Sequence, residues 1–117
     1  MRLIIKANKI ELSPALRAYC QTKMDKIEKY LGTLKALSVE ITVAKEVGGQ
    51  RQGKIFRSEV SLRLPGELLR VEKSAADLYK AIDKVEEHLE RAIKKHKDKL
   101  TAKTKKSRPA KSGLRLN

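Results

Sequence analysis

The chain is poor in aromatic residues: its 117 residues include one phenylalanine, three tyrosines and no tryptophan. Modules that read unpaired bases commonly stack them on exposed aromatic rings. Phe56 and Tyr19 fall in phase with apolar neighbours, and Tyr79 directly follows an apolar leucine. Only Tyr30, at the border of an apolar helix side, is placed to stack a base. If the chain binds nucleic acid, we therefore expect contacts to backbone phosphates and recognition of overall shape.

Cysteine and long apolar runs are also scarce. Cys20 is the single cysteine, so no internal disulfide is possible, and no stretch has the length of a signal peptide or membrane span. Both features favour a reducing, cytoplasmic setting and argue against a membrane partner. The opening residues 1–6 alternate as a strand does, which a signal peptide does not.

The sequence offers little support for catalysis. Cys20 lies on the apolar side of a predicted helix, where an unreactive thiol is expected, and no motif links it to His88 or His96. There is no metal-ligand spacing, no phosphate-binding glycine loop and no dinucleotide-binding turn. We therefore expect a binding protein with no enzymatic activity, no metal and no cofactor.

Acidic residues are outnumbered two to one, and the formal net charge is +14. Residues 101–117 contain six lysines or arginines and no acid, which leaves +8 on residues 1–100. Such an excess points to an anionic partner. The last residues show no apolar periodicity and include Pro109 and Gly113. We expect one folded domain over residues 1–100 and a disordered basic tail over residues 101–117.

Two helices are predicted from apolar residues spaced three and four apart. The first begins at Ser13-Pro14, a capping residue followed by a proline suited to the first turn, and stops at Gly32. The second is expected to open at residues 74–77, which resemble a capping box, and to end near Leu100. Their apolar sides comprise Leu16, Tyr19, Cys20, Met24, Ile27 and Leu31 in the first, and Leu78, Ile82, Val85, Leu89 and Ile93 in the second.

Four strands complete the pattern. Residues 2–7 are rich in strand formers, and residues 37–43 and 56–64 alternate between apolar and polar. Pro65-Gly66 predicts a tight turn into a last strand containing Leu69 and Val71. The order β-α-β-β-β-α predicts an α+β fold of two layers: a four-stranded, mainly antiparallel sheet with both helices on one face, as in double-stranded-RNA-binding domains. A right-handed first crossover would make the first two strands parallel.

Basic residues gather along one edge of each predicted helix. Lys23, Lys26 and Lys29 line the first helix, and Lys84, His88, Arg91 and Lys95 recur along the second at steps of four, three and four. Acidic residues of the second helix lie toward its other edge. If the helices pack side by side, the two basic edges could border one phosphate-binding groove. The sequence does not fix which edges meet.

A plain solvated surface is the competing interpretation. In the second helix acids precede lysines, which complements the helix dipole, and Glu87–Arg91 and Glu90–Lys94 are ordinary pairs one turn apart. For either helix alone, a solvated surface explains the charge pattern as well as a phosphate-binding surface does. The matched asymmetry of both helices, together with the net charge, favours nucleic acid.

Several stretches resemble a known family. Residues 10–17, Lys23 and residues 26–30 resemble the first helix of bacterial ribosome hibernation factors, and residues 77–83 and 89–91 resemble the second-helix signature. Over residues 1–100 the chain is identified as a member of the family of hibernation promoting factors and ribosome-associated inhibitors, in its short form. Long-form relatives add a dimerising domain, for which this sequence is too short.

The resemblance implies a fold like the one predicted above and a function in translation. Family members bind the 30S subunit in the channel used by mRNA and by A- and P-site tRNAs, compete with them, and silence translation in starved cells. By this resemblance Lys23, Lys26, Lys29, Arg91 and Lys95 would contact the 16S rRNA backbone. Lys84 and His88, on the same basic edge of the second helix, complete the predicted RNA-binding set. His88 stands where relatives often carry lysine, which would make that contact weaker or pH-sensitive. Whether the protein promotes or blocks ribosome pairing stays open, and we expect a monomer when it is free.

Two other functions fit the same features. A sheet covered by two helices can also read A-form grooves, as a general double-stranded RNA-binding module does. A basic surface could instead bind acidic proteins, for example in transcription regulation.

Overall fold

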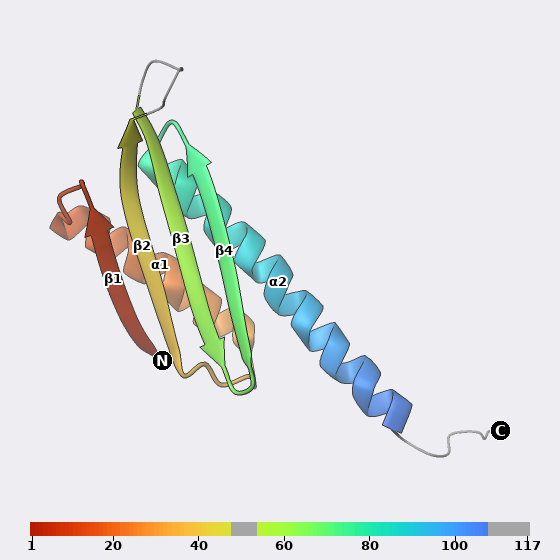
Figure 1. Cartoon of the computed structure of the whole chain (residues 1–117). Helices are drawn as coiled ribbons and strands as arrows, with labels where there is room; N and C mark the ends of the chain where they lie inside the picture. The colour runs from red at the N-terminus through yellow and green to blue at the C-terminus, as the bar shows by residue number, and fades with distance from the viewer. Residues whose placement is uncertain (48–53, 108–117) are drawn as a thin grey trace.

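A computed structural model describes residues 1–47 and 54–107 (Figure 1). The elements follow the predicted order β-α-β-β-β-α. They are β1 (Arg2–Asn8), α1 (Pro14–Leu31), β2 (Ser38–Val47), β3 (Lys54–Leu64), β4 (Glu67–Ala75) and α2 (Leu78–Ser107).

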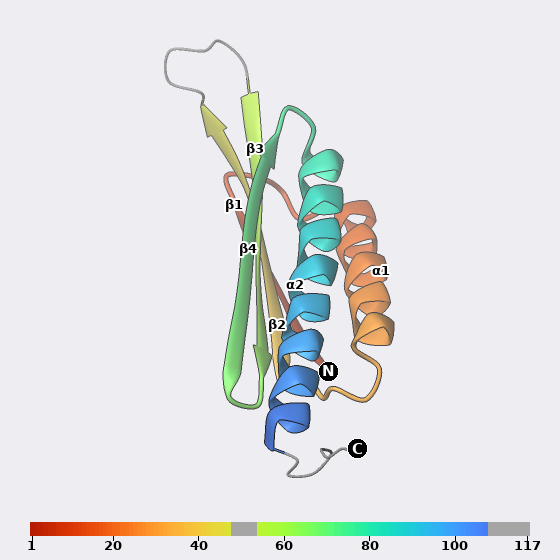
Figure 2. The same ribbon diagram turned by 90° about the vertical axis from the view of Figure 1, so that its right-hand side faces the viewer.

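The four strands form one sheet in the order β1-β2-β3-β4. β1 pairs with β2 in parallel, as the right-handed crossover predicts, and the other two pairings are antiparallel. The register aligns Ile5, Ile41, Val60 and Val71 in one row across all four strands. Because side chains alternate between faces, this row fixes which face of the sheet is apolar. Both helices lie side by side on that face (Figure 2).

The core lies between the sheet and the two helices. Each helix turns one stripe at three- and four-residue spacing toward the apolar face, and the stripe residues are at most 3% exposed. They are Leu16, Cys20, Met24, Ile27 and Leu31 in α1, and Ile82, Val85, Leu89 and Ile93 in α2. The predicted stripes are therefore confirmed, except that Tyr19 and Leu78 are only partly buried.

Helix termini agree with the prediction for α1 and differ for α2. The Ser13 hydroxyl accepts from the Leu16 backbone N–H at 3.1 Å, and Gly32 follows the helix with φ of 64°. In α2 the cap is Asp77, whose side chain accepts from the Tyr79 N–H at 2.9 Å. Ser74 instead belongs to β4, where it pairs with Arg57 of β3. The predicted capping box at residues 74–77 is therefore wrong.

The C-terminal boundary of α2 also differs from the prediction. The helix ends at Ser107, seven residues beyond the expected end at Leu100, because no glycine or proline interrupts the sequence between Gly66 and Pro109. Lysines near a helix C-terminus also complement its dipole. Residues 108–117 of the expected tail, and the predicted glycine loop at 48–53, lie outside the described residues. The division of the chain at residue 100 stays a prediction.

The open face of the sheet carries paired charges of both signs. Arg57 contacts Glu72 at 2.8 Å and Glu46 at 3.5 Å, and Lys6 contacts Glu40 at 2.6 Å. Cross-strand pairing of this kind stabilises a solvent-facing sheet. It leaves no uniformly positive surface on that face among the described residues.

Candidate nucleic-acid interface

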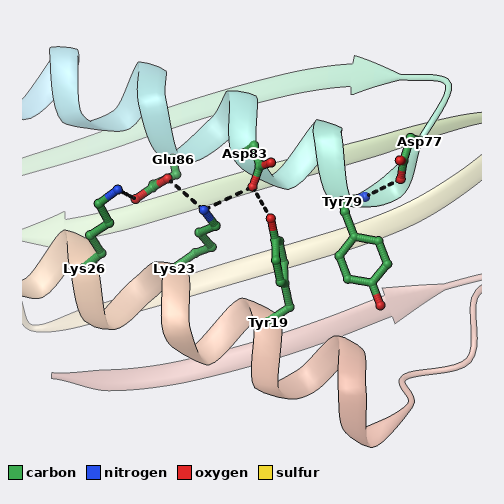
Figure 3. Close-up of polar contacts among 7 residues, drawn as sticks. All are labelled: Tyr19, Lys23, Lys26, Asp77, Tyr79, Asp83 and Glu86. Carbon is green, nitrogen blue, oxygen red and sulfur yellow. Dashed lines mark hydrogen bonds and ion pairs between the residues drawn. The ribbon is translucent and has the colours of Figure 1, made fainter.

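The seam between the two helices is held by charges of opposite sign. The Lys23 ammonium lies 3.2 Å from Asp83 and 3.5 Å from Glu86, and Lys26 lies 3.4 Å from the other oxygen of Glu86. Figure 3 shows both lysines of α1 pointing toward the two carboxylates of α2. We call this cluster of Lys23, Lys26, Asp83 and Glu86 the helix seam.

Aromatic contacts extend the seam toward the start of α2. The Tyr19 hydroxyl donates to Asp83, and the Tyr19 ring meets the ring of Tyr79 edge-on, with 4.7 Å between the centroids (Figure 3). The hydrogen bond to Asp83 raises the pKa of Tyr19 above its ordinary value, and burial adds to this. Tyr19 thus fastens α1 to α2 at the edge of the core.

The expected common groove between two basic edges is therefore wrong. The basic edge of α1 faces the acidic edge of α2, because the Glu86 side chain is only 7% exposed and needs cationic partners. Burial opposes the charge on Lys23, but Asp83 and Glu86 outweigh it and raise the pKa of Lys23. Two basic edges facing each other would have repelled.

The four basic residues of α2 that were predicted to bind phosphate lie on its opposite side, beside β4, and we call them the outer row: Lys84, His88, Arg91 and Lys95. The Lys84 ammonium donates to the backbone carbonyl of Ser74 in β4 at 3.4 Å. Arg91 contacts Glu87 at 3.6 Å, with both side chains about two-thirds exposed. Lys95 is exposed and has no carboxylate within ion-pair distance among the described residues. The outer row is thus a cationic edge open to solvent.

The remaining predicted contacts on α1 divide by exposure. Lys23 is largely enclosed in the seam, with a side chain 21% exposed, whereas the Lys26 side chain is 64% exposed despite its ion pair. Lys29 is exposed and unpaired among the described residues. The predicted set of seven is therefore not one surface: four residues lie on the outer side of α2, two in the seam and one on the solvent side of α1.

Lys73 of β4 belongs beside the outer row and was missed from the sequence. It interacts electrostatically with His88 and follows Leu69 and Val71 on the helix-facing side of the strand. The signal was present, since a lysine at an inward-facing position of an alternating strand is unusual. Burial, Lys73 and Arg91 lower the pKa of His88 from its ordinary value, because each of them disfavours the protonated ring.

Tyr30, the one candidate for base stacking, has a cation on its ring. The Lys97 ammonium lies 5.3 Å from the ring centroid and donates to the Tyr30 carbonyl at 2.8 Å. This contact satisfies a carbonyl at the end of α1 and occupies a face of the ring. That face of the Tyr30 ring is therefore not open to a stacked base in this structure.

Cys20 has the properties of a packing residue. It is fully buried, and burial raises the pKa of its thiol to about 11, so almost no thiolate is present at neutral pH. Within residues 1–47 and 54–107, no three histidine, cysteine or acidic side chains come together as metal ligands. In the same residues, no helix is both long and apolar enough to cross a membrane.

Comparison with known proteins identifies the family of the chain. The family model described as sigma 54 modulation protein / S30EA ribosomal protein matches residues 3–101. A ribosome hibernation promoting factor of Escherichia coli is 31% identical over 100 residues, which cover 86% of this chain and 97% of that protein. A ribosome hibernation promotion factor of Deinococcus radiodurans is 30% identical over 100 residues, covering 86% of this chain and 51% of the relative. The chain spans about half the length of such longer relatives.

Solved structures share the fold. The N-terminal domain of Thermus thermophilus Protein Y has a TM-score of 0.64 and 29% identity, with 82% of this chain and 99% of that domain covered. A ribosomal subunit interface protein from Coxiella burnetii, at 20% identity, has a TM-score of 0.63, with 84% of this chain and 99% of that protein covered. From the family match and the Escherichia coli relative, the chain belongs to the S30EA ribosomal protein family, that of the ribosome hibernation promoting factors.

Proposed function

We propose that the protein is a ribosome hibernation factor, which binds the 30S subunit in the channel used by mRNA and by A- and P-site tRNAs. It would act in the cytoplasm, as a monomer when free, and would inhibit translation in stressed or stationary cells by competing with both RNAs. The names of the relatives support the ribosomal role. The observation that carries the mode of binding is the outer row, a solvent-exposed cationic edge with a single ion pair among its described members.

The outer row has the form needed for a phosphate backbone. From Lys84 to Lys95 it extends about 16 Å along the helix axis, enough to follow several phosphates of one 16S rRNA strand. Lysine and arginine at these positions would neutralise phosphates and release counterions. We assign Lys26 and Lys29 to a secondary contact, and Lys23 mainly to holding the seam.

Charge reversal on the outer row tests the proposal. Changing Lys84, Arg91 and Lys95 to glutamate should abolish co-sedimentation with 30S subunits, while the circular dichroism spectrum stays that of the unmodified protein. The matched control reverses three exposed cations away from the row: Arg17, Lys35 and Arg63. This control has the same net charge and should still bind. Equal loss of binding in both variants would mean that net charge, and not the outer row, drives association.

Occupancy of the channel is tested by competition. Bound tRNA or mRNA should reduce binding of the protein to 30S subunits, and the protein should reduce theirs. Binding unaffected by either RNA would contradict the proposed location.

A second candidate is transcription regulation, which the words sigma 54 modulation in the family description favour. Ribonuclease treatment of a cell lysate before capture of the protein separates the two: a hibernation factor should lose its partner, and a transcription regulator should keep it. A general double-stranded RNA-binding module would bind a plain RNA duplex as tightly as 30S subunits at the same salt concentration.

A further inference from the structure

Lys73 is a half-buried cation with no acidic partner. It lies on the helix-facing side of β4, where its strand neighbour is the fully buried Ser58. None of the described carboxylates comes within ion-pair distance of its ammonium. A lysine placed this way has no acidic counter-charge in the free protein, so its ammonium is open to an anion.

Other cations gather at the same place. Lys84 donates to the carbonyl of Ser74, the residue after Lys73, so the two lysines occupy the same end of the strand. His88 lies one turn further along α2 and interacts electrostatically with Lys73, Lys84 and Arg91. Among the described residues, the acid that acts on His88 is Glu87, which already contacts Arg91 at 3.6 Å. The cluster therefore has an excess of positive charge.

The state of His88 reflects this excess. Burial and the surrounding cations lower its pKa, so they favour the uncharged ring in the free protein. An anion bound between Lys73 and Lys84 would raise the pKa of His88, because its negative charge favours the protonated ring. The ring would then donate to the anion as the lysines do.

We propose that Lys73, Lys84 and His88 form one subsite for a phosphodiester of the RNA backbone, bridging β4 and α2. The inference rests on the proposed function and extends the RNA-binding surface from the helices onto the edge strand. Because His88 takes up a proton when the phosphate binds, this subsite makes RNA binding pH-dependent.

Binding of the full chain to 30S subunits and to a short RNA duplex, measured from about pH 8 to about pH 5.5, tests the subsite. Affinity should rise as the pH falls through the range of His88. H88Q should remove this rise. H96Q is the matched control, since His96 lies two turns away on the same helix, and it should keep the rise.

Lys73 is tested at constant pH by salt dependence. K73M should weaken binding several-fold and reduce the slope of log affinity against log salt by about one, whereas K73R should bind like the unmodified protein. Binding of K73M with unchanged affinity and slope would overturn the subsite, as would an unchanged pH dependence in H88Q. Rescue by K73R distinguishes lost charge from a damaged fold.

The pKa of the His88 ring distinguishes an RNA phosphodiester from free phosphate as the ligand. It is measured by NMR in the presence of the RNA duplex or of inorganic phosphate, at equal ionic strength. RNA should raise this pKa more than inorganic phosphate does; an equal rise would assign the site to free phosphate and contradict the proposal. If K73M and H88Q bind normally while the outer-row reversal abolishes ribosome binding, the subsite fails and the proposed function stands. If the duplex shows the predicted dependence but 30S subunits do not bind, the proposed function fails instead.

Discussion

Glu86 is the residue on which the pairing of the helices depends. Its side chain is 7% exposed, and it contacts Lys23 and Lys26 of the other helix. Removing a carboxylate from water costs several kcal/mol unless cations replace the lost hydration. The two lysines supply them, which explains why the basic edge of α1 faces inward and cannot be a free phosphate-binding surface along its whole length.

Replacing Lys23 alone should therefore destabilise the protein. K23M leaves Glu86 buried with only the exposed Lys26 beside it, and we expect a loss of about 1–3 kcal/mol in the free energy of unfolding. The double variant K23M/E86M should recover most of this loss, because two apolar side chains then pack where an ion pair was. Urea denaturation measures both. A K23M protein as stable as the unmodified one would show that the seam contributes little.

Replacing Glu90, in contrast to replacing Lys23, should stabilise the protein. Burial and the neighbouring Glu86 carboxylate raise its pKa above 4.5, so the folded state holds the Glu90 proton more tightly than the unfolded state. Its ionisation therefore reduces stability as the pH rises above 4.5, and the reduction is complete once the pH lies above the pKa of the folded state. E90Q should raise the urea midpoint at about pH 7 and lose this advantage below about pH 4.5. E87Q, at an exposed position, serves as the control and should change little; a lower midpoint for E90Q at neutral pH would contradict the assignment.

At the scale of elements, local chemistry fixes where α2 begins. Asp77 caps α2, while Ser74, three residues earlier, is paired in β4. D77A should lower the free energy of unfolding by about 1 kcal/mol, and S74A should stay within about 0.5 kcal/mol of the unmodified protein. Thermal or urea unfolding of the two variants decides between the caps. A larger loss of stability in S74A than in D77A would support the capping box predicted from the sequence.

The elements were largely predictable because each is specified by its own residues. Ser13-Pro14 and Gly32 define α1, Pro65-Gly66 defines the turn before β4, and the alternation of Val39, Ile41 and Val43 defines a strand. The contact between the two helices was not predictable in this way, because the sequence of a charged helix edge does not determine which edge of the other helix it faces. Charge complementarity between Lys23 and the Asp83–Glu86 edge was a usable signal. The alternation after Leu69 and Val71 placed Lys73 on the inward side of its strand, but its neighbours on β3 and α2 depend on the assembled sheet.

At the scale of the whole molecule, charge is separated by surface. The open face of the sheet carries paired charges, the seam neutralises part of α1, and the outer row stays cationic. The outer row and Lys73 therefore place an excess of positive charge on one side of α2 and β4. Such a one-sided field steers an anionic partner toward a single face. The fold determines where the cations lie, and ion pairs with carboxylates determine which of these cations remain free to bind an anionic partner.

The salt dependence of binding to 30S subunits tests this account most directly. Each phosphate contact contributes roughly one to the slope of log affinity against log salt. The neutral variant K84M/R91M/K95M should therefore lower the slope by about three, whereas K23M should leave it nearly unchanged. A triple variant with an unchanged slope, or a K23M protein that loses as much as the triple variant, would contradict the outer row as the phosphate-binding edge.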